Sequence, residues 1–268
     1  IIMLSMIAGA GVATLYSVGG GAWSPWAGTH ALRFAISAFV MIVMGLVGIR
    51  YWLALSYPIY VIALVALALV PIIGDVNMGA RRWIDVGPMQ FQPSELMKIG
   101  IVLALARYYH GLRAEQVSHI LFLIPPAVMI AAPVGLVFLQ PDLGTAIMIG
   151  ATGAAIMVLA GLSWRLIFLG AAAAVGGAIA AFRLGVLHDY QLKRIFTFLD
   201  PDSDPLGAGY HLLQSKIGLG SGGLVGKGYM MGTQRELNFL PEMQTDFIFT
   251  IFGEEFGLVG CVGLLLLY

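Results

Sequence analysis

The chain has 268 residues, of which 59% are hydrophobic and 10% are charged, and its mean hydropathy is +0.91. Soluble domains carry about 25% charged residues, so this composition excludes an ordinary soluble protein and indicates an integral membrane protein. The formal net charge is zero, which argues against a nucleic-acid partner. The single cysteine, Cys261, lies in an apolar run, which excludes a disulfide framework and a thiolate metal site.

Eight apolar runs approach the length of about 20 residues that crosses a bilayer as a helix. The first run lacks the basic flank of a signal peptide, so we interpret it as a span. The chain has no initiator Met and its last run has no flanking charge, so we expect residues 1–268 to be one membrane domain truncated at its C-terminus. We predict an all-α, polytopic transmembrane bundle with spans at about 1–18, 31–49, 53–73, 94–109, 119–139, 142–162, 164–182 and 247–268.

Two connections between these spans are long. Residues 74–93 form one, and residues 183–246 form the other, which holds most of the polar residues of the chain. Long connections in a compact bundle are usually functional or disordered. The segment YHLLQSKIGL (210–219) has the apolar spacing of a short amphipathic helix. We therefore predict that 183–246 is a large loop folded against the membrane face.

Counting eight spans places both long connections on the same side of the membrane. The positive-inside rule does not orient that side, because the short loops of the two faces carry four basic residues each. One face is therefore rich in polar side chains, and the other is nearly bare. The rich face receives the 183–246 loop together with His30, Arg81, Arg82, Trp83, Asp85, Glu95, Lys98 and Asp142.

Three spans begin on the rich face with similar motifs: QPSE (92–95), QPDLG (140–144) and LPEMQTD (240–246). Each motif alone is explained by helix initiation, because Pro suits the first helical position and an acid complements the helix dipole. Charged groups at membrane depth nevertheless tend to mark sites or pathways, and here all three share a face. For Asp142 in the second motif, the structural and functional interpretations stay equally open.

Further charged and aromatic residues on the rich face have two interpretations. Glu95 and Lys98 are three residues apart, so they form either a structural ion pair or a phosphate-binding lysine held by its neighbour. Arg81, Arg82 and Trp83 are either interfacial anchors or a cationic and aromatic patch for an anionic lipid headgroup.

Two other motifs receive structural interpretations. GLGSGG (218–223) matches a dinucleotide fingerprint, but no strand precedes it and no helix clearly follows, so we expect a flexible or tightly turned loop. Glu254 and Glu255 lie two turns inside the last span, where facing lipid would be costly. We expect them to pair inside the bundle with an Arg or with backbone donors.

Asp246 stands at the mouth of the last apolar run, with Phe247, Ile248 and Phe249 behind it. One interpretation is helix capping, in which Thr245 or Asp246 accepts the free amides of the last helix. The other is general-base chemistry, which suits a carboxylate at the water boundary beside an apolar wall. Glu242, in the same motif, keeps the structural interpretation of an acid that precedes a helix.

Four separated motifs together resemble one family. GARRWIDVG…FQPSELMK, QPDLGTA, YHLLQSKIGLGSGGLVGKG and GTQRELNFLPEMQTDFIFTIFGEEFGLVG are similar, in order and spacing, to the SEDS family (shape, elongation, division and sporulation). The stretch GKGYMMGTQRELNFLPE (226–242) is more similar to elongation members than to division members. The family has about ten spans, so the resemblance also implies that the last two are absent.

The resemblance implies a glycosyltransferase of the bacterial cytoplasmic membrane. Such an enzyme polymerises lipid II into peptidoglycan strands on the outer face, with a class B penicillin-binding protein and other elongation-complex membrane proteins as partners. By motif matching, Asp246 is the catalytic carboxylate, and Glu95, Lys98, Trp83 and Asp142 are substrate-site residues. No nucleotide or redox cofactor is implied, and a divalent cation (Mg or Mn), where one is used, would be carried by the pyrophosphate together with Asp246 or Asp142.

One position departs from the family pattern. Many members have Arg two residues before the Gln of QPSE, where this chain has Gln90, so Arg81 or Arg82 would substitute in binding phosphate. Two other functions stay open: a flippase or transporter of lipid-linked precursors, and a non-catalytic membrane scaffold for a penicillin-binding protein. A transporter would have polar residues on both faces and a site near the membrane midplane, whereas polarity here is one-sided.

Overall fold

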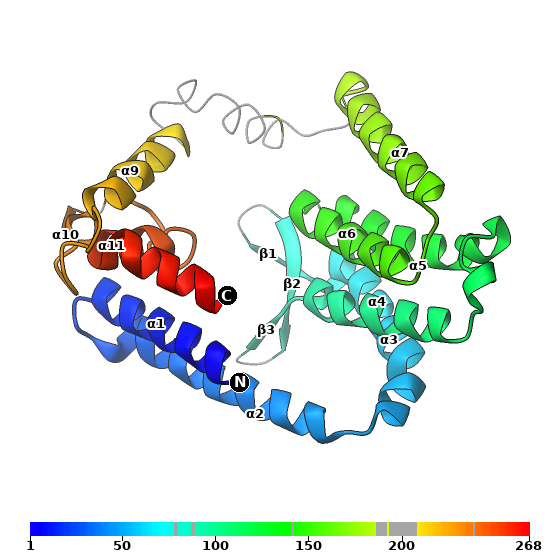
Figure 1. Cartoon of the computed structure of the whole chain (residues 1–268), viewed down its shortest axis with the longest axis horizontal. Coiled ribbons are helices and arrows are strands. Elements are labelled where there is room, and N and C mark those ends of the chain that lie inside the picture. The colour runs from blue at the N-terminus through cyan, green and yellow to red at the C-terminus, as the bar shows by residue number, and fades with distance from the viewer. Residues whose placement is uncertain (78–79, 87–88, 141, 186–191, 193–207, 238) are drawn as a thin grey trace. The chain divides into compact units, whose positions relative to one another are not determined.

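The computed structural model describes residues 1–77, 80–86, 89–140, 142–185, 192, 208–237 and 239–268. It contains two compact units (Figure 1). Unit 1 combines Ile1–Leu46 with His188–Tyr268, and unit 2 is Val47–Leu187. Each unit is described by itself below.

All eight predicted spans are helices, with ends that differ from the predicted ones by a few residues. They are α1 (Ile2–Val18), α2 (Gly28–Leu46), α3 (Ile49–Ile73), α4 (Pro93–His110), α5 (Ile120–Leu139), α6 (Leu143–Leu159), α7 (Trp164–Arg183) and α11 (Ile248–Leu267). Among the described residues, five helical segments are long and apolar enough to cross a membrane: Trp23–Leu46, α3, α5, α7 and α11. Helices α1 and α6 are apolar but only 17 residues long. The predicted all-α, multi-pass class is confirmed.

The core of unit 2 is formed by α3, α4, α5 and α6. Leu67, Met97 and Ile149 are fully buried there. Helices α3 and α4 approach closely at Gly100, where an added Cβ would lie 3.2 Å from the Cα of Tyr60. Small residues permit such approaches between membrane helices, where packing rather than hydrophobic burial drives association.

The connection between α3 and α4 contains short strands that the all-α prediction missed. Strands β1 (Asp75–Asn77), β2 (Ala80–Val86) and β3 (Met89–Phe91) form antiparallel pairs in the order β1-β2-β3. The register pairs Asp75 with Trp83 and Ile84 with Phe91. Two of these strands are three residues long, which is too short for an alternating pattern to be recognised in the sequence.

Unit 1 contains α1, α2 and α11 with two further helices from the long loop, α9 (Ala208–Ser221) and α10 (Thr233–Leu237). A short helical turn at Trp23–Ala27 (η1) joins α1 to α2. Helix α9 packs against α11, and the Ser215 and Thr250 hydroxyl oxygens lie 2.6 Å apart. The helix predicted around 210–219 is therefore confirmed. Most of the first part of the loop, 186–191 and 193–207, lies outside the described residues.

Candidate functional site

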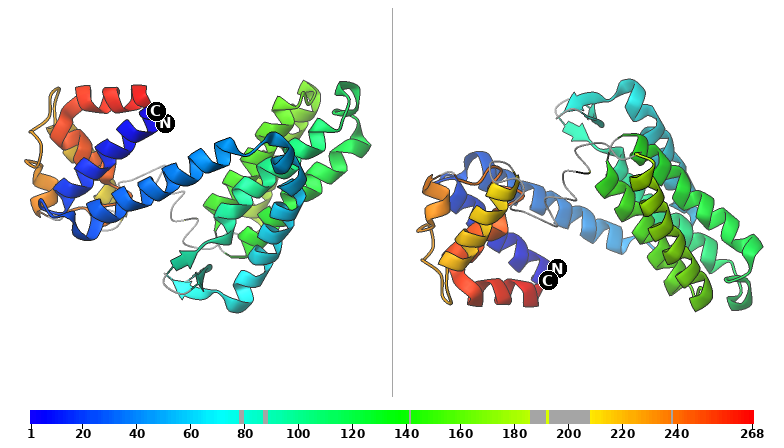
Figure 2. Two further views of the ribbon diagram at one scale, coloured as in Figure 1. Left: turned by 90° about the horizontal axis from the view of Figure 1, so that it is seen from below. Right: turned by 90° about the horizontal axis from the view of Figure 1, so that it is seen from above.

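Helix α11 is interrupted at Gly257, which has φ 65° and ψ −167° (Figure 2, where the red helix has two segments at an angle). In an uninterrupted helix, the Leu258 and Val259 N–H groups would donate to the Glu254 and Glu255 carbonyls. The interruption leaves these four backbone groups needing other partners, because unpaired backbone groups are costly in an apolar surrounding.

A loop segment that we call the glycine strap, residues 222–228, supplies those partners. The strap donates from Lys227 N to the Glu254 carbonyl (2.9 Å) and from Gly228 N to the Glu255 carbonyl (3.1 Å). Its Gly223 and Leu224 carbonyls accept from the Leu258 and Val259 N–H groups at 2.9 and 3.0 Å. Two broken helical hydrogen bonds are thus replaced by four bonds to the strap.

The glycines of the strap are required by this close approach. At Gly222 and at Gly226, where φ is +82°, an added Cβ would overlap backbone atoms of α11. The loop expected for GLGSGG is therefore observed at 222–223, whereas residues 218–221 are the last residues of α9. Its glycines permit backbone contact with a membrane helix.

Glu254 fixes the strap through its side chain. The residue is fully buried, and its carboxylate accepts from Lys227 Nζ (2.6 Å), Thr233 N (2.9 Å), Thr233 Oγ1 (2.7 Å) and Gln234 N (3.1 Å). The predicted pairing of Glu254 inside the bundle is confirmed, with a lysine rather than an arginine as its cation. Because α10 begins at Thr233, the same carboxylate holds both the strap and α10 against α11.

Glu255 links α11 to α1. It is 1% exposed, and one carboxylate oxygen accepts from the Ser17 hydroxyl of α1. Arg235 Nη1 donates to the Ser17 carbonyl at 3.1 Å, and the Tyr229 hydroxyl donates to the Ala13 carbonyl at 2.9 Å. Burial, together with the nearby Glu255 carboxylate, raises the pKa of Tyr229 above its ordinary value. These contacts attach α1 to α11, to α10 and to Tyr229, which directly follows the strap.

Asp246 lies in the turn that precedes α11. The turn is closed by the Glu242 carbonyl, which accepts from Thr245 N at 3.0 Å, and Glu242 has a positive φ of 49°. Helix α11 begins at Ile248 with Phe247 as its N-cap, and no side chain caps it. The capping interpretation of Thr245 or Asp246 is therefore wrong. The Asp246 side chain is exposed and makes no hydrogen bond or ion pair with any described residue.

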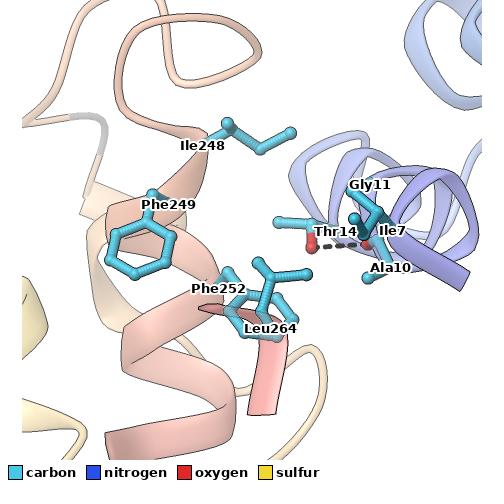
Figure 3. Close-up of a pocket in the computed structure, with 8 residues that line it drawn as sticks. All are labelled: Ile7, Ala10, Gly11, Thr14, Ile248, Phe249, Phe252 and Leu264. Atoms are coloured by element: carbon cyan, nitrogen blue, oxygen red, sulfur yellow. Dashed lines mark hydrogen bonds between the residues drawn. The ribbon is translucent and has the colours of Figure 1, made fainter. Parts of the chain in front are cut away.

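Two cavities of unit 1 adjoin this turn. A polar cavity of about 230 Å³ is lined by Gln244 and Thr245 from the turn and by Leu15, Pro25, Trp26, Thr29, His30 and Arg33. An apolar cavity of about 180 Å³ lies between α1 and the start of α11, lined by Ile7, Ala10, Gly11, Thr14, Ile248, Phe249, Phe252 and Leu264 (Figure 3). In the sequence, Asp246 thus comes directly after residues that line the polar cavity and before residues that line the apolar cavity.

The other predicted site residues belong to unit 2. Asp142 is the N-cap of α6: its carboxylate accepts from Thr145 N at 3.2 Å and from Thr145 Oγ1 at 2.9 Å. The capping interpretation of Asp142 is confirmed. Its Oδ2 also lies 3.9 Å from Arg82 Nε, and Arg82 donates to the Gln140 carbonyl at 3.4 Å. Asp142 therefore caps a helix and orients a guanidinium at the same time.

The predicted pair on α4 is present. Lys98 Nζ lies 2.8 Å from Glu95 Oε2, with side-chain exposures of 27% and 57%. Arg81 is exposed and donates to the Pro71 carbonyl at 2.9 Å, and Trp83 is half-buried. Asp85 and Gln90 are in β2 and β3, but their side chains lie outside what the structure describes.

The predicted site residues thus fall into two groups. Unit 2 brings Arg82 to Asp142 and Lys98 to Glu95, while Asp246 belongs to unit 1. The prediction missed Lys227 as the cation of Glu254, although the Lys–Gly sequence after a glycine-rich stretch was visible. No group of three or more His, Cys, Asp or Glu side chains arranged to hold a metal is found among the described residues.

The fold and these groups define a class: a multi-pass membrane protein with a glycine-rich loop bound to an interrupted helix and an exposed aspartate before it. The family model for cell cycle proteins of the FtsW, RodA and SpoVE type matches residues 1–268. The chain belongs to this family, the SEDS family.

Two curated relatives show how far the similarity extends. Peptidoglycan glycosyltransferase MrdB of Escherichia coli K12 is 43% identical over 242 residues, covering 88% of this chain and 63% of the relative. Probable peptidoglycan glycosyltransferase FtsW of Halothiobacillus neapolitanus is 34% identical over 251 residues, covering 88% and 58%. The chain therefore spans less than two thirds of the length of these relatives.

Two solved structures are similar over the whole chain. One comes from work on structural coordination of polymerization and crosslinking by a peptidoglycan synthase complex. Its TM-score is 0.78 at 31% identity, and the match covers 73% of that chain. The other, the rod shape determining protein RodA of Thermus thermophilus, has a TM-score of 0.67 at 27% identity and is covered to 69%. The similarity therefore extends from sequence to fold.

Proposed function

We propose that this protein is a peptidoglycan glycosyltransferase that polymerises lipid II into β-1,4 glycan strands for cell elongation. Its place is the bacterial cytoplasmic membrane, with the site facing outward. The observation that carries the proposal is the exposed carboxylate of Asp246. It has no described partner, and it stands directly after Gln244 and Thr245, which line a polar cavity, and just before a membrane helix. The names of the curated relatives at 43% and 34% identity support the same activity.

In the proposed reaction, the Asp246 carboxylate takes the proton from the 4-hydroxyl of the acceptor sugar. The freed oxygen attacks the anomeric carbon of the donor, and the bond from that carbon to the pyrophosphate breaks, releasing undecaprenyl pyrophosphate. Attack from the opposite side inverts the α-linked donor to a β-linkage, so one base is enough. The exposed position of Asp246 suits this role, because a general base must reach the proton that it removes.

The charge that develops on the leaving pyrophosphate needs cations. Lys98, held by Glu95, and Arg82, oriented by Asp142, supply fixed positive charge on unit 2, and exposed Arg81 adds to it. Trp83 would stack on a sugar face, as half-buried aromatic side chains can. The Arg82–Asp142 contact supports Arg82 rather than Gln90 as the phosphate-binding group.

Among the residues that the structure describes, a divalent cation would be bound through a single carboxylate together with substrate phosphates. Mg²⁺ is usually bound through one or two carboxylates together with substrate phosphates. Asp246 fits that requirement better than Asp142, whose two oxygens already accept from Thr145. The cation would neutralise pyrophosphate charge.

The proposed partners are a class B penicillin-binding protein, which would cross-link the strands, and other membrane proteins of the elongation complex. This proposal is supported by the TM-score of 0.78 to a protein solved in work on a peptidoglycan synthase complex.

The decisive experiment uses purified full-length protein, with its penicillin-binding partner, and lipid II. We expect Asp246→Asn to lower the rate of glycan formation by about 100-fold or more, the usual contribution of a positioned base. Glu242→Gln is the matched control, because Glu242 lies in the same exposed turn and its side chain accepts only from Gln244 among the described residues. Undiminished glycan synthesis by Asp246→Asn would overturn the base assignment.

A transporter of lipid-linked precursors is the second candidate, because interrupted helices often form transport sites and α11 is interrupted at Gly257. At this interruption, however, the Glu254 carboxylate and the four freed backbone groups are bonded to the strap and α10. Lipid II flipping in vesicles without polymer formation would favour the transporter. Absence of both activities would favour a membrane scaffold for the penicillin-binding protein.

A further inference from the structure

A proline in the last turn of α3 leaves a buried backbone carbonyl without its helical donor. Pro71 has no N–H, so it cannot donate to the carbonyl four residues earlier, which is that of Leu67. Leu67 is fully buried in the core of unit 2. A buried carbonyl in a membrane helix needs a partner, so another part of the chain has to supply a donor.

Gln140, at the end of α5, supplies that donor. Its Nε2 donates to the Leu67 carbonyl at 2.9 Å, across a separation of 73 residues in the sequence. Gln140 is the C-cap of α5 and is 5% exposed. Because a buried side-chain amide is costly unless it is hydrogen-bonded, this bond explains a glutamine at the first position of the QPDLG motif. The bond joins the end of α5 to the last turn of α3.

The backbone on both sides of this bond faces the two arginines of β2. The Gln140 carbonyl accepts from Arg82 Nε at 3.4 Å, and Asp142 Oδ2 lies 3.9 Å from the same nitrogen. The Pro71 carbonyl accepts from Arg81 Nη1 at 2.9 Å. The proline and the glutamine thus each hold one arginine through a backbone carbonyl, while the glutamine side chain joins their two helices.

We propose that Gln140 is a positioning residue for departure of the pyrophosphate. By fastening the end of α5 to α3, it holds the carbonyl and the nearby carboxylate that orient the Arg82 guanidinium. The Arg82 side chain is 33% exposed, so an anion can reach it. A neutral amide suits this position, because it donates to the Leu67 carbonyl and adds no charge beside the arginine. The inference rests on the proposed function, which assigns Arg82 to the leaving pyrophosphate.

The first test is steady-state glycan synthesis by the full-length protein with its penicillin-binding partner. Gln140→Leu removes the donor, and we expect kcat/KM for lipid II to fall by about tenfold, as for a lost hydrogen bond to a charged group. Most of the change should be in KM, because the pyrophosphate is already charged in the bound substrate.

A double-mutant cycle shows whether Gln140 acts through Arg82. In an Arg82→Gln background, Gln140→Leu should cause little further loss of kcat/KM, because no guanidinium is left to position. Equal losses in the two backgrounds would overturn the inference.

A second cycle separates positioning from stability. Pro71→Ala restores an N–H that can donate to the Leu67 carbonyl within α3, so Gln140→Leu should lower the melting temperature less in that background than in the parent. The loss of kcat/KM should persist, because the end of α5 is still not fastened to α3. Recovery of both quantities together would indicate a purely structural role and overturn the inference. Where Gln140→Leu alone does not fold, the comparison within the Pro71→Ala background carries the kinetic test.

Two controls match these variants. Pro58→Ala restores an N–H elsewhere in α3 and should not raise the melting temperature of Gln140→Leu toward that of its own background. Gln116→Leu removes a glutamine before the other end of α5, where its Oε1 accepts from Arg113 N at 3.0 Å, and should leave the KM unchanged.

The inference and the proposed function can fail separately, because binding of inorganic pyrophosphate to the purified protein can be measured without catalysis. Arg82-dependent binding that Gln140→Leu weakens, in a protein that forms no glycan, would keep the positioning role and reject the polymerase. Glycan synthesis with a kcat/KM that is indifferent to Gln140→Leu would keep the polymerase and reject the positioning role. A protein that neither forms glycan nor binds pyrophosphate through Arg82 would reject both.

Discussion

Replacing Glu254 with alanine should release the glycine strap from α11 and destabilise unit 1. The carboxylate is fully buried and accepts from the Lys227 ammonium, the Thr233 hydroxyl and two backbone N–H groups, those of Thr233 and Gln234. The Glu254→Ala variant would leave all of these donors without their acceptor at once.

The size of the effect follows from those contacts. Removing one partner of a buried ion pair costs about 3–5 kcal/mol, and each buried donor left unpaired costs about 1–3 kcal/mol. Lys227 keeps 29% of its side-chain surface exposed, so water recovers part of its loss. We therefore expect a loss of about 3–4 kcal/mol in unfolding free energy for Glu254→Ala. Glu254→Gln keeps one carbonyl acceptor, and we expect about half of that loss.

The assay is reversible unfolding of the purified protein in mixed detergent and SDS, with limited proteolysis of residues 222–237 as a local readout. Glu242→Ala serves as the control, because this exposed acid should change stability by less than about 0.5 kcal/mol. A double-mutant cycle with Lys227→Met isolates the ion pair. A Glu254→Ala loss below about 1 kcal/mol, or strictly additive effects in the cycle, would refute the view that Glu254 fastens the strap.

Three further substitutions test other parts of the structure. Gly226→Ala should destabilise unit 1 by several kcal/mol, because Gly226 has φ +82° and an added Cβ would overlap the α11 backbone. Gly220→Ala is the control and should be tolerated, since nothing lies within 4 Å of its Cβ position, and equal melting temperatures of the two variants would contradict the prediction. Asp142→Ala should lower the unfolding free energy by about 0.5–2 kcal/mol through loss of the α6 cap, whereas Asp142→Asn retains the cap. Loss of glycan synthesis in a stable Asp142→Asn protein would therefore show that the charge of Asp142 acts on substrate through Arg82. Lys98→Met should change the unfolding free energy by less than about 1 kcal/mol, since the pair with Glu95 is partly exposed. The same variant should raise the KM for lipid II, and an unchanged KM would show that the pair has only a structural role.

The sequence predicted the features that depend on local spacing. The eight apolar runs are eight helices in the structure. They could be predicted because the length of a span is set by the bilayer thickness and does not depend on tertiary contacts. The Glu95–Lys98 contact follows from a separation of three residues on a helix. The cap by Asp142 follows from Asp standing directly before α6, with Thr145 at the position that a capping side chain reaches.

The features that the sequence did not reveal depend on long-range contacts. Gly257 lies in an apolar run that reads as continuous helix, and its interruption is stable only because the strap, about 30 residues earlier, supplies the missing backbone partners. The short strands between α3 and α4 likewise depend on pairing with each other. Arg33 and Gln244 are 211 residues apart, and only the fold shows that they line one cavity.

The same distinction separates the acids around α11. Glu254 lies in an apolar run, where the sequence predicted structural pairing, and its carboxylate accepts several hydrogen bonds that hold the strap and α10. Asp246 reads as a helix cap, but α11 starts two residues later with Phe247 as its N-cap, and the turn is closed by the Glu242 carbonyl instead. Among the described residues, the Asp246 carboxylate forms no hydrogen bond or ion pair, and because it is exposed it is accessible to accept a proton. The acid that is buried at membrane depth is therefore the structural one, and the exposed acid at the boundary is the one we assign to chemistry.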